Sequence, residues 1–162
     1  MKKKMRIGIA HKDIGGVEHG GICTLYKNLA SELNILGCEV HILTTRTDWH
    51  PFGIHLHQIS LKDDDKIAYS ERVSQRLEEL DLDVVECSTW GYELLTYARL
   101  HHWKAKVVVR GDLSAVTIGA TLHGRFEKEL LDLADAKAFV SRFAKRDLER
   151  QYGKQVGPVI YL

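Results

Sequence analysis

Two adjacent glycines directly before a predicted helix are the first residues whose type and position could do chemistry. Gly20 and Gly21 end a glycine-rich loop at residues 15–21, which follows the short apolar segment 7–10. The first N–H groups of a helix have no partner inside it, and the helix dipole favours negative charge at that end. Since glycine leaves the backbone uncovered, the pair predicts a binding position for an anionic group. The alternative is a turn that requires a positive φ.

Charged and aromatic side chains stand at the ends of two apolar, β-branched segments further along the chain. Glu86 and Trp90 follow the first of these segments, and Arg110 and Asp112 follow the second. Carboxylate and guanidinium groups hold polar ligands through charge-assisted hydrogen bonds, and an aromatic ring can stack on a sugar. Three alternatives stay open: an Arg110–Asp112 ion pair on the surface, a buried and paired Glu86, and packing of Trp90 at the rim of the core.

Nine histidines raise the question of a metal site. His55 and His57 fall on one face of a predicted strand, and His101 and His102 are adjacent. Neither pair has a third ligand at a spacing typical of metal centres, so no metal site is predicted. The acidic residues 63–65 precede a predicted helix and are interpreted as its cap rather than as metal ligands.

Composition limits the class of protein. The chain has 162 residues, enough for one domain, and 23 basic against 22 acidic side chains, a balance that gives no reason to expect a nucleic acid or an anionic membrane as partner. Three cysteines without a Cys-x-x-Cys pair argue against a disulfide framework and fit a reducing cytoplasm. No signal peptide is apparent, and no apolar segment reaches the roughly 20 residues of a transmembrane helix.

Strand and helix patterns alternate along the whole chain. Strands are predicted at residues 7–10, 40–45, 54–61, 84–87, 105–109, 136–140 and 156–162, and helices at 22–36, 66–80, 92–101, 125–134 and 142–152. This order predicts an α/β fold, a Rossmann-like parallel sheet with helices on both faces. Ligands of such sheets bind beyond the carboxyl ends of the strands. We therefore expect the site among residues 11–21, 44–49, 86–90 and 110–114.

Several common site motifs are absent. The glycine loop fits neither a P-loop nor the Gly-x-Gly-x-x-Gly fingerprint, and the sequence has no Gly-x-Ser-x-Gly and no His-Glu-x-x-His.

The order of the remaining motifs resembles a known family. The chain contains RIGIA, GGVEHGGICTLYKNLASELNILGCEVHILTT, DLDVVECSTWGYELLTYAR, VVVRGDLSAV and LADAKAFVSRFAKRDLERQYG in that order. Together they resemble the N-terminal domain of retaining glycosyltransferases of the GT-B fold, family 4. The resemblance implies that residues 1–162 form a single acceptor-side domain. A C-terminal domain with a Glu-x7-Glu motif, which grips the nucleotide-sugar donor in this family, is absent from the chain, so the chain alone is expected to be inactive.

The resemblance also implies roles for individual residues. Gly20 and Gly21 would lie near the donor diphosphate, and Asp112 would take a catalytic role in a loop where many members carry a histidine. The acceptor cleft would contain Glu86, Trp90, Arg110, His123 and Arg125. The substrates would be a nucleotide sugar and a small-molecule or lipid-linked acceptor, with no metal or other cofactor. The alternative is a stand-alone or truncated Rossmann-like binding module without activity of its own.

Overall fold

The computed structural model describes residues 3–14, 20–46, 48–61, 65–100 and 104–161. The strands are β1 (Arg6–Ala10), β2 (Glu39–Thr44), β3 (Ile54–Gln58), β4 (Val84–Ser88), β5 (Lys106–Gly111) and β6 (Ala136–Phe139). The helices are α1 (Gly21–Ile35), α2 (Lys66–Glu78), α3 (Leu95–Arg99), α4 (Gly124–Leu133) and α5 (Arg142–Tyr152), with a 3-10 turn η1 (Thr121–His123) before α4. Strands and helices alternate as the sequence patterns predict.

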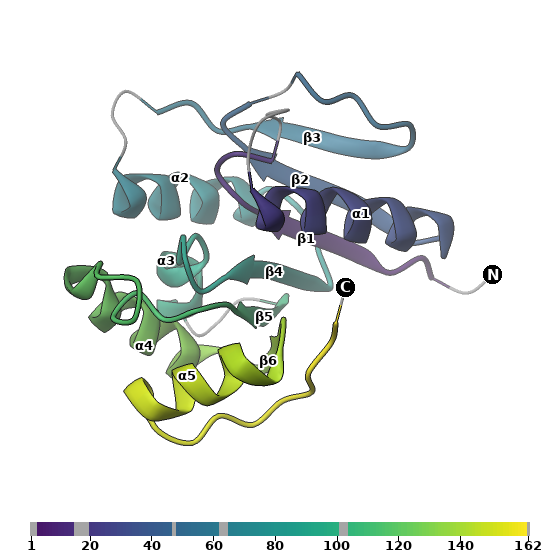
Figure 1. Ribbon diagram of the computed structural model, residues 1–162. Helices are drawn as coiled ribbons and strands as arrows, with labels where there is room; N and C mark the ends of the chain where they lie inside the picture. Colours follow the sequence, from purple (N-terminus) through teal and green to yellow (C-terminus); the bar gives the residue numbers. More distant parts are fainter. Residues whose placement is uncertain (1–2, 15–19, 47, 62–64, 101–103, 162) are drawn as a thin grey trace.

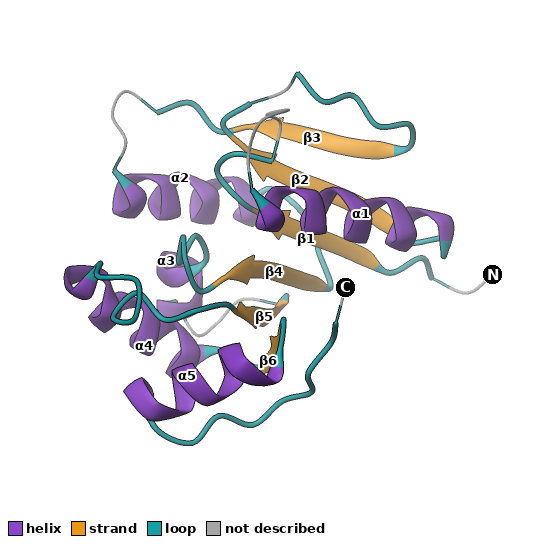
Figure 2. Ribbon diagram, viewed as in Figure 1, coloured by secondary structure: helices purple, strands orange, loops and turns teal. Residues whose placement is uncertain are grey.

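The strands form one parallel sheet in the order β3-β2-β1-β4-β5-β6. Helices cover both faces of this sheet, so the prediction of a Rossmann-like α/β fold is confirmed (Figures 1 and 2). β3 and β6 lie at the two edges. The order reverses between β1 and β4, and this is the point at which such sheets bind ligands.

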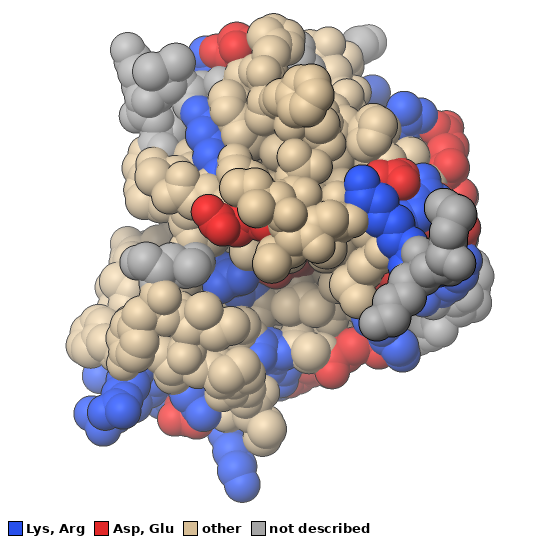
Figure 3. All heavy atoms as spheres, turned by 90° about the vertical axis from the view of Figure 1, so that its right-hand side faces the viewer, with Lys and Arg blue, Asp and Glu red and all other residues tan. Residues whose placement is uncertain are grey.

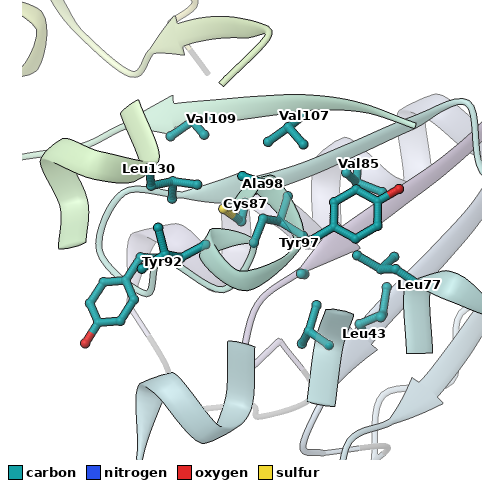
Figure 4. Close-up of a cluster of buried hydrophobic side chains, with 14 of the residues drawn as sticks. Leu43, Leu77, Val85, Cys87, Tyr92, Tyr97, Ala98, Val107, Val109 and Leu130 are labelled. Carbon is teal, nitrogen blue, oxygen red and sulfur yellow. The ribbon is translucent and has the colours of Figure 1, made fainter. Parts of the chain in front are cut away.

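Side-chain alternation along the strands separates the core into two layers. Ile9 and Ile42 are register partners and pack with α1, whereas their neighbours Ala10 and Leu43 belong to the layer under α2, α3 and α4. Figure 4 shows part of the second layer, in which Val85 and Val107 lie beside residues of α3. Alternate strand residues point to opposite faces, so a strand buried on both sides is apolar throughout.

Side-chain caps mark the starts of two helices. The Ser141 hydroxyl accepts a hydrogen bond from the Ala144 N–H at 3.0 Å and caps α5. Asp65 caps α2 in the same way, which confirms a capping role for that member of the acidic run; Asp63 and Asp64 lie outside the described residues. Of the helices that the structure describes, none has both the length and the apolar character needed to cross a bilayer.

Two predicted elements differ in the structure. Residues 156–161 do not form the strand predicted at 156–162, and residue 162 lies outside the described residues. The segment contacts β6 through an isolated bridge between Phe139 and Val159, since Pro158 has no N–H to donate to a ladder. The helix predicted over 92–101 is shorter, because Tyr92 has a φ of 41° and cannot belong to a right-handed helix.

Figure 3 shows the face that carries the amino ends of the strands. Acidic and basic side chains lie beside one another over its right-hand part. Ion pairs such as Arg6–Glu39 and Lys3–Asp83 form between residues at or just before the amino ends of β1, β2 and β4.

Gly111 at the end of β5 allows the close approach of α5 and should not tolerate a side chain. A Cβ at this position would lie 2.6 Å from both Leu148 Cδ1 and Phe139 Cδ1. We expect Gly111→Ala to lower the free energy of unfolding by about 1–3 kcal/mol through overpacking, measured by urea unfolding followed by circular dichroism. Gly21→Ala is the matched control, because no described atom lies within 4 Å of its Cβ position. Equal stability of the two variants would contradict this account of the β5–α5 packing.

Candidate active site

A cavity of about 440 Å³ lies over the carboxyl ends of the central strands. Its lining comes from the start of α1, the start of α5 and the loops after β4, β5 and β6, and consists of Ile22, Trp90, Asp112, Leu113, Ile118, Val140, Ser141, Phe143 and Ala144. The walls are mostly apolar, and Asp112 brings the only charged side chain among the residues named. Trp90 is 38% exposed and Phe143 67%, so large apolar surfaces face the opening.

A buried ion pair lies on the α1 side of the sheet, close to this cavity. Arg110 of β5 donates from Nε to Glu86 Oε1 of β4 at 2.6 Å, and the two side chains are only 4% and 13% exposed. Burial raises the pKa of Glu86, and the neighbouring guanidinium opposes that rise. The alternative of a surface pair between Arg110 and Asp112 is therefore wrong: Arg110 is buried, and its ion-pair partner is Glu86.

Asp112 stands in the cavity wall with an unusual carboxyl group. Its Oδ2 atom is buried and has no hydrogen-bond partner among the described residues, while its backbone N–H donates to Thr89 Oγ1 at 3.2 Å. Burial raises the pKa of Asp112 to about 6, although Arg110 and His11 favour its charged form. A carboxyl group that titrates this close to neutrality can accept a proton from a bound hydroxyl group and return it.

His11 and Glu93 form a second buried pair that the sequence did not single out. His11 follows β1, and its Nδ1 lies 2.9 Å from Glu93 Oε1, with both side chains less than a tenth exposed. Burial opposes a charge on His11, but the contacts with Cys23 and Glu93 outweigh this and raise its pKa to about 10. Both residues follow the end of a strand, and this position is the one feature of the sequence from which they could have been predicted as site residues.

Gly20 and Gly21 lie where α1 begins. Among the described residues no side chain caps this helix start, and no atom lies within 4 Å of a Cβ position at either glycine. The φ of Gly20 is 12°, and neither glycine adopts the left-handed conformation. A turn that requires a positive φ therefore stays an alternative at Gly20, while the space beside both glycines leaves room for a ligand to approach the backbone.

His123 and Arg125 lie in a different and larger cavity, of about 720 Å³, between α2 and α4. The Tyr92 hydroxyl lies 2.9 Å from His123 Nδ1, and the Arg125 guanidinium lies over the Phe126 ring. Burial and nearby Lys66 lower the pKa of His123. The structure therefore groups Asp112, Trp90 and the start of α1 around one cavity and places these two residues in another.

Trp90 joins the two cavities. Lys66, which lines the larger one, lies with Nζ 4.0 Å from the centre of the Trp90 ring and donates to the Trp90 carbonyl oxygen at 2.9 Å. This cation–π contact fixes the ring at the rim of the smaller cavity. The sequence analysis left open whether Trp90 packs at the rim of the core, and Trp90 lies at the rim in the structure. The exposed part of its side chain faces the cavity.

Comparison with known proteins places this geometry in a family. The sequence model of Glycosyltransferase Family 4 matches residues 19–161. The comparison with curated protein sequences gave no match.

Similar folds occur among solved structures. Sucrose-phosphate synthase from Thermosynechococcus elongatus has a TM-score of 0.71 at 12% identity, with 98% of this chain and 47% of that chain covered. The catalytic domain of starch synthase IV from Arabidopsis thaliana, bound to ADP and acarbose, has a TM-score of 0.64 at 13% identity, with coverages of 98% and 51%.

A UDP-N-acetylglucosamine 2-epimerase has a TM-score of 0.61 at 12% identity, with coverages of 98% and 48%. The chain thus spans about half the length of these structures. Since one of them is an epimerase, the shared fold alone does not decide the reaction.

Asp112 should destabilise the folded chain at neutral pH. Its folded-state pKa of about 6 lies above the ordinary value of 3.8, so the folded state holds the proton more tightly and stability falls as pH rises through this window. We expect Asp112→Asn to raise the free energy of unfolding at pH 7 by about 1–3 kcal/mol, with a smaller gain at pH 4, by urea unfolding.

Asp147 is the matched control, and its replacement should have the opposite sign. Burial opposes its charge, but hydrogen bonds from Thr117, Ser114 and Arg150 outweigh burial and lower its pKa to about 2. Its stabilisation is present above pH 3.8 and is lost as pH falls toward 2. Asp147→Asn should therefore lower the free energy of unfolding at pH 7 by about 2 kcal/mol. Stability changes of the same sign in both variants would refute the assignment.

Proposed function

The chain belongs to glycosyltransferase family 4 and has the fold of the N-terminal domain of a GT-B glycosyltransferase, and from this premise we propose that it forms the acceptor side of an enzyme that transfers a sugar from a nucleotide-sugar donor with retention of configuration. The acceptor is a small molecule or a lipid-linked molecule. Donor binding is assigned mainly to a second domain, because the chain spans about half of the structures that it resembles.

One observation carries this proposal: a titratable carboxyl group in the wall of a cavity at the reversal point of the sheet. Asp112 supplies the carboxyl group, and the cavity is closed on one side by the start of α1 and on the other by the start of α5. A sugar acceptor presents hydroxyl groups to polar partners and C–H faces to apolar ones. The combination of Asp112 with Trp90 and Phe143 suits both kinds of surface.

The residues around the cavity take distinct roles in this proposal. Asp112 hydrogen-bonds the reacting hydroxyl group and accepts its proton. The backbone amides at Gly20 and Gly21 face the donor diphosphate when a second domain delivers it. The Glu86–Arg110 ion pair lies near Asp112 and keeps its place as part of the acceptor cleft in this proposal. No metal is part of the proposal, because the helix amides offset charge on the diphosphate.

A location in the cytoplasm is part of the proposal. All three cysteines are free, and Cys23 and Cys87 are buried as small apolar residues. Free thiols of this kind persist where the compartment is reducing.

The alternative function is a stand-alone Rossmann-like module that binds a ligand without turning it over. The epimerase among the similar structures favours keeping it, since the fold serves reactions other than transfer. Incubation of the protein, as its gene encodes it, with a panel of nucleoside-diphosphate sugars and sugar acceptors separates the two. Release of nucleoside diphosphate that depends on acceptor supports the transferase, and saturable binding without release supports the module.

Asp112→Asn should impair transfer through the acceptor rather than through folding. We expect kcat/KM for the acceptor to fall by about 100-fold, because a proton acceptor is lost. The wild-type activity should decline below pH 6, where Asp112 becomes protonated, and the variant should lack that decline. Asp132→Asn, at an exposed ion pair with Lys128 on α4, is the control and should leave the profile unchanged. Unchanged acceptor kinetics in Asp112→Asn would remove Asp112 from the site.

Gly21→Ala should impair the donor rather than the acceptor. The added methyl group meets no described atom within 4 Å, so the fold should keep its stability. A diphosphate that approaches the helix amides would meet that methyl group, and the KM for the nucleotide sugar should rise by about ten-fold or more. Measurement of both KM values, with circular dichroism to verify folding, tests this. A rise in the acceptor KM alone would place the diphosphate elsewhere.

A further inference from the structure

Three histidines and one glutamate lie together on the two outermost strands at the β3 edge, away from the active-site cavity. His41 of β2 is the register partner of His55 of β3, and His57 follows two residues later on the same face. Glu39 stands two residues before His41, so its side chain also points to that face. The parallel pairing of β2 with β3 thus gathers four potential ligands that are as much as 18 residues apart in sequence.

The distances within this cluster are short. The ring of the buried His41 lies between the other two imidazoles, with centroids 4.7 Å from His55 and 5.1 Å from His57. His41 Nε2 lies 2.9 Å from Glu39 Oε1. One ligand atom each from Glu39, His41 and His55 lies within 4.8 Å of the others. Ligand atoms of a tetrahedral zinc site stand about 3.3 Å apart, so a small rotation of the exposed His55 side chain is enough to close the set.

Hydrogen bonds define the tautomers of the cluster without a metal. Arg76 donates to His57 Nδ1 at 3.1 Å, so a neutral His57 carries its proton on Nε2. That N–H donates to His41 Nδ1 at 2.9 Å, and His41 in turn donates from Nε2 to Glu39. This chain of hydrogen bonds therefore runs from the Arg76 guanidinium to the Glu39 carboxylate, and the imidazoles of His57 and His41 are both uncharged in it.

We propose that Glu39, His41 and His55 bind a divalent transition-metal ion of the zinc type, and that His57 positions His41 for this role. In the bound form His41 carries its proton on Nδ1 and donates it to His57 Nε2, which frees His41 Nε2 for the metal. Each imidazole keeps one proton, so the tautomer change balances. A metal-bound histidine that donates its other N–H to a fixed acceptor is the usual support of such sites.

The two arginines at the cluster already have other partners. Arg6 donates to Glu39 Oε1 at 2.8 Å, but it also contacts Asp81, and Arg76 pairs with Glu79. Arg76 can leave His57 and keep that ion pair, which releases His57 Nδ1 to carry the proton. The second oxygen of Glu39 adds lone pairs that the Arg6 contact at Oε1 does not use.

The donor set indicates which ions to expect. Two imidazole nitrogens and one carboxylate oxygen suit Zn²⁺, Co²⁺, Ni²⁺ and Cu²⁺ better than Mg²⁺ or Ca²⁺, which prefer oxygen ligands. Three protein ligands leave one position of a tetrahedron for water. An ion here links the edge strand β3 to β2 and should raise the melting temperature of the protein.

The test is a titration of the protein, as its gene encodes it and with any affinity tag removed, by Zn²⁺ alone in calorimetry and by Co²⁺ alone in visible absorption. We expect one saturable site, a Co²⁺ spectrum of four-coordinate type and a higher melting temperature with Zn²⁺. His55→Ala and Glu39→Gln should each weaken binding by at least about ten-fold. His55 is exposed, so its variant keeps the fold, and Glu39→Gln preserves the shape of the side chain.

His50→Ala is the matched control, because His50 is also exposed and lies outside the cluster. It should bind Zn²⁺ as the wild type does. Absence of saturable binding, or equal affinity in the His50→Ala and His55→Ala variants, would overturn the proposal. Neither result bears on sugar transfer, since the cluster shares no residue with the active-site cavity.

Discussion

All six strands run in the same direction, and this constraint determines where everything else can lie. A parallel strand cannot be followed by a tight hairpin, so each connection crosses back over a face of the sheet, usually as a helix. Every strand then delivers its carboxyl end to the same edge. Asp112 after β5, Trp90 after β4 and the start of α1 after β1 meet there because of this direction, although they are far apart in sequence.

Charge is concentrated beneath that edge to an extent unusual for a protein interior. A buried guanidinium cannot lose its proton, so Arg110 needs a fixed counter-charge, and Glu86 on the adjacent strand provides it. His11 and Glu93 repeat the arrangement after β1. With these pairs in place, Asp112 is the carboxyl group left without a partner for Oδ2, and its pKa rises toward neutrality as a result of burial.

Periodicity and capping residues were sufficient to predict most of the fold. The apolar runs predicted the strands, and the acidic run predicted the cap that Asp65 forms on α2, because these signals depend on residues that are close in sequence. The strand prediction for the last segment was wrong for a different reason. Val159 has the apolar character of a strand residue, but a strand also needs a ladder of hydrogen bonds to a neighbouring strand, which Pro158 interrupts.

The candidate site was predictable only as a set of strand ends. Position after a strand marked Glu86, Arg110 and Asp112, yet the sequence could not tell that Arg110 pairs with Glu86 rather than with its near neighbour. That choice depends on the register of β4 against β5. The same limit applies to the histidines, where a third ligand for His55 comes from His41 on the adjacent strand and not from any spacing within β3.

Most of the buried polar side-chain atoms without a partner among the described residues lie in or after β4 and β5 or in α4. They are Ser88 Oγ, Glu93 Oε2, Arg110 Nη1, Asp112 Oδ2 and Glu127 Oε1, and Tyr26 in α1 and Ser74 in α2 contribute one atom each. Each such atom costs about 1–3 kcal/mol. At the amino ends of the strands, by contrast, Arg6 and Lys3 form ion pairs with exposed or half-buried carboxylates. Of the unpaired groups Asp112 lines the cavity, so a ligand bound there would supply the hydrogen bond that its Oδ2 atom lacks.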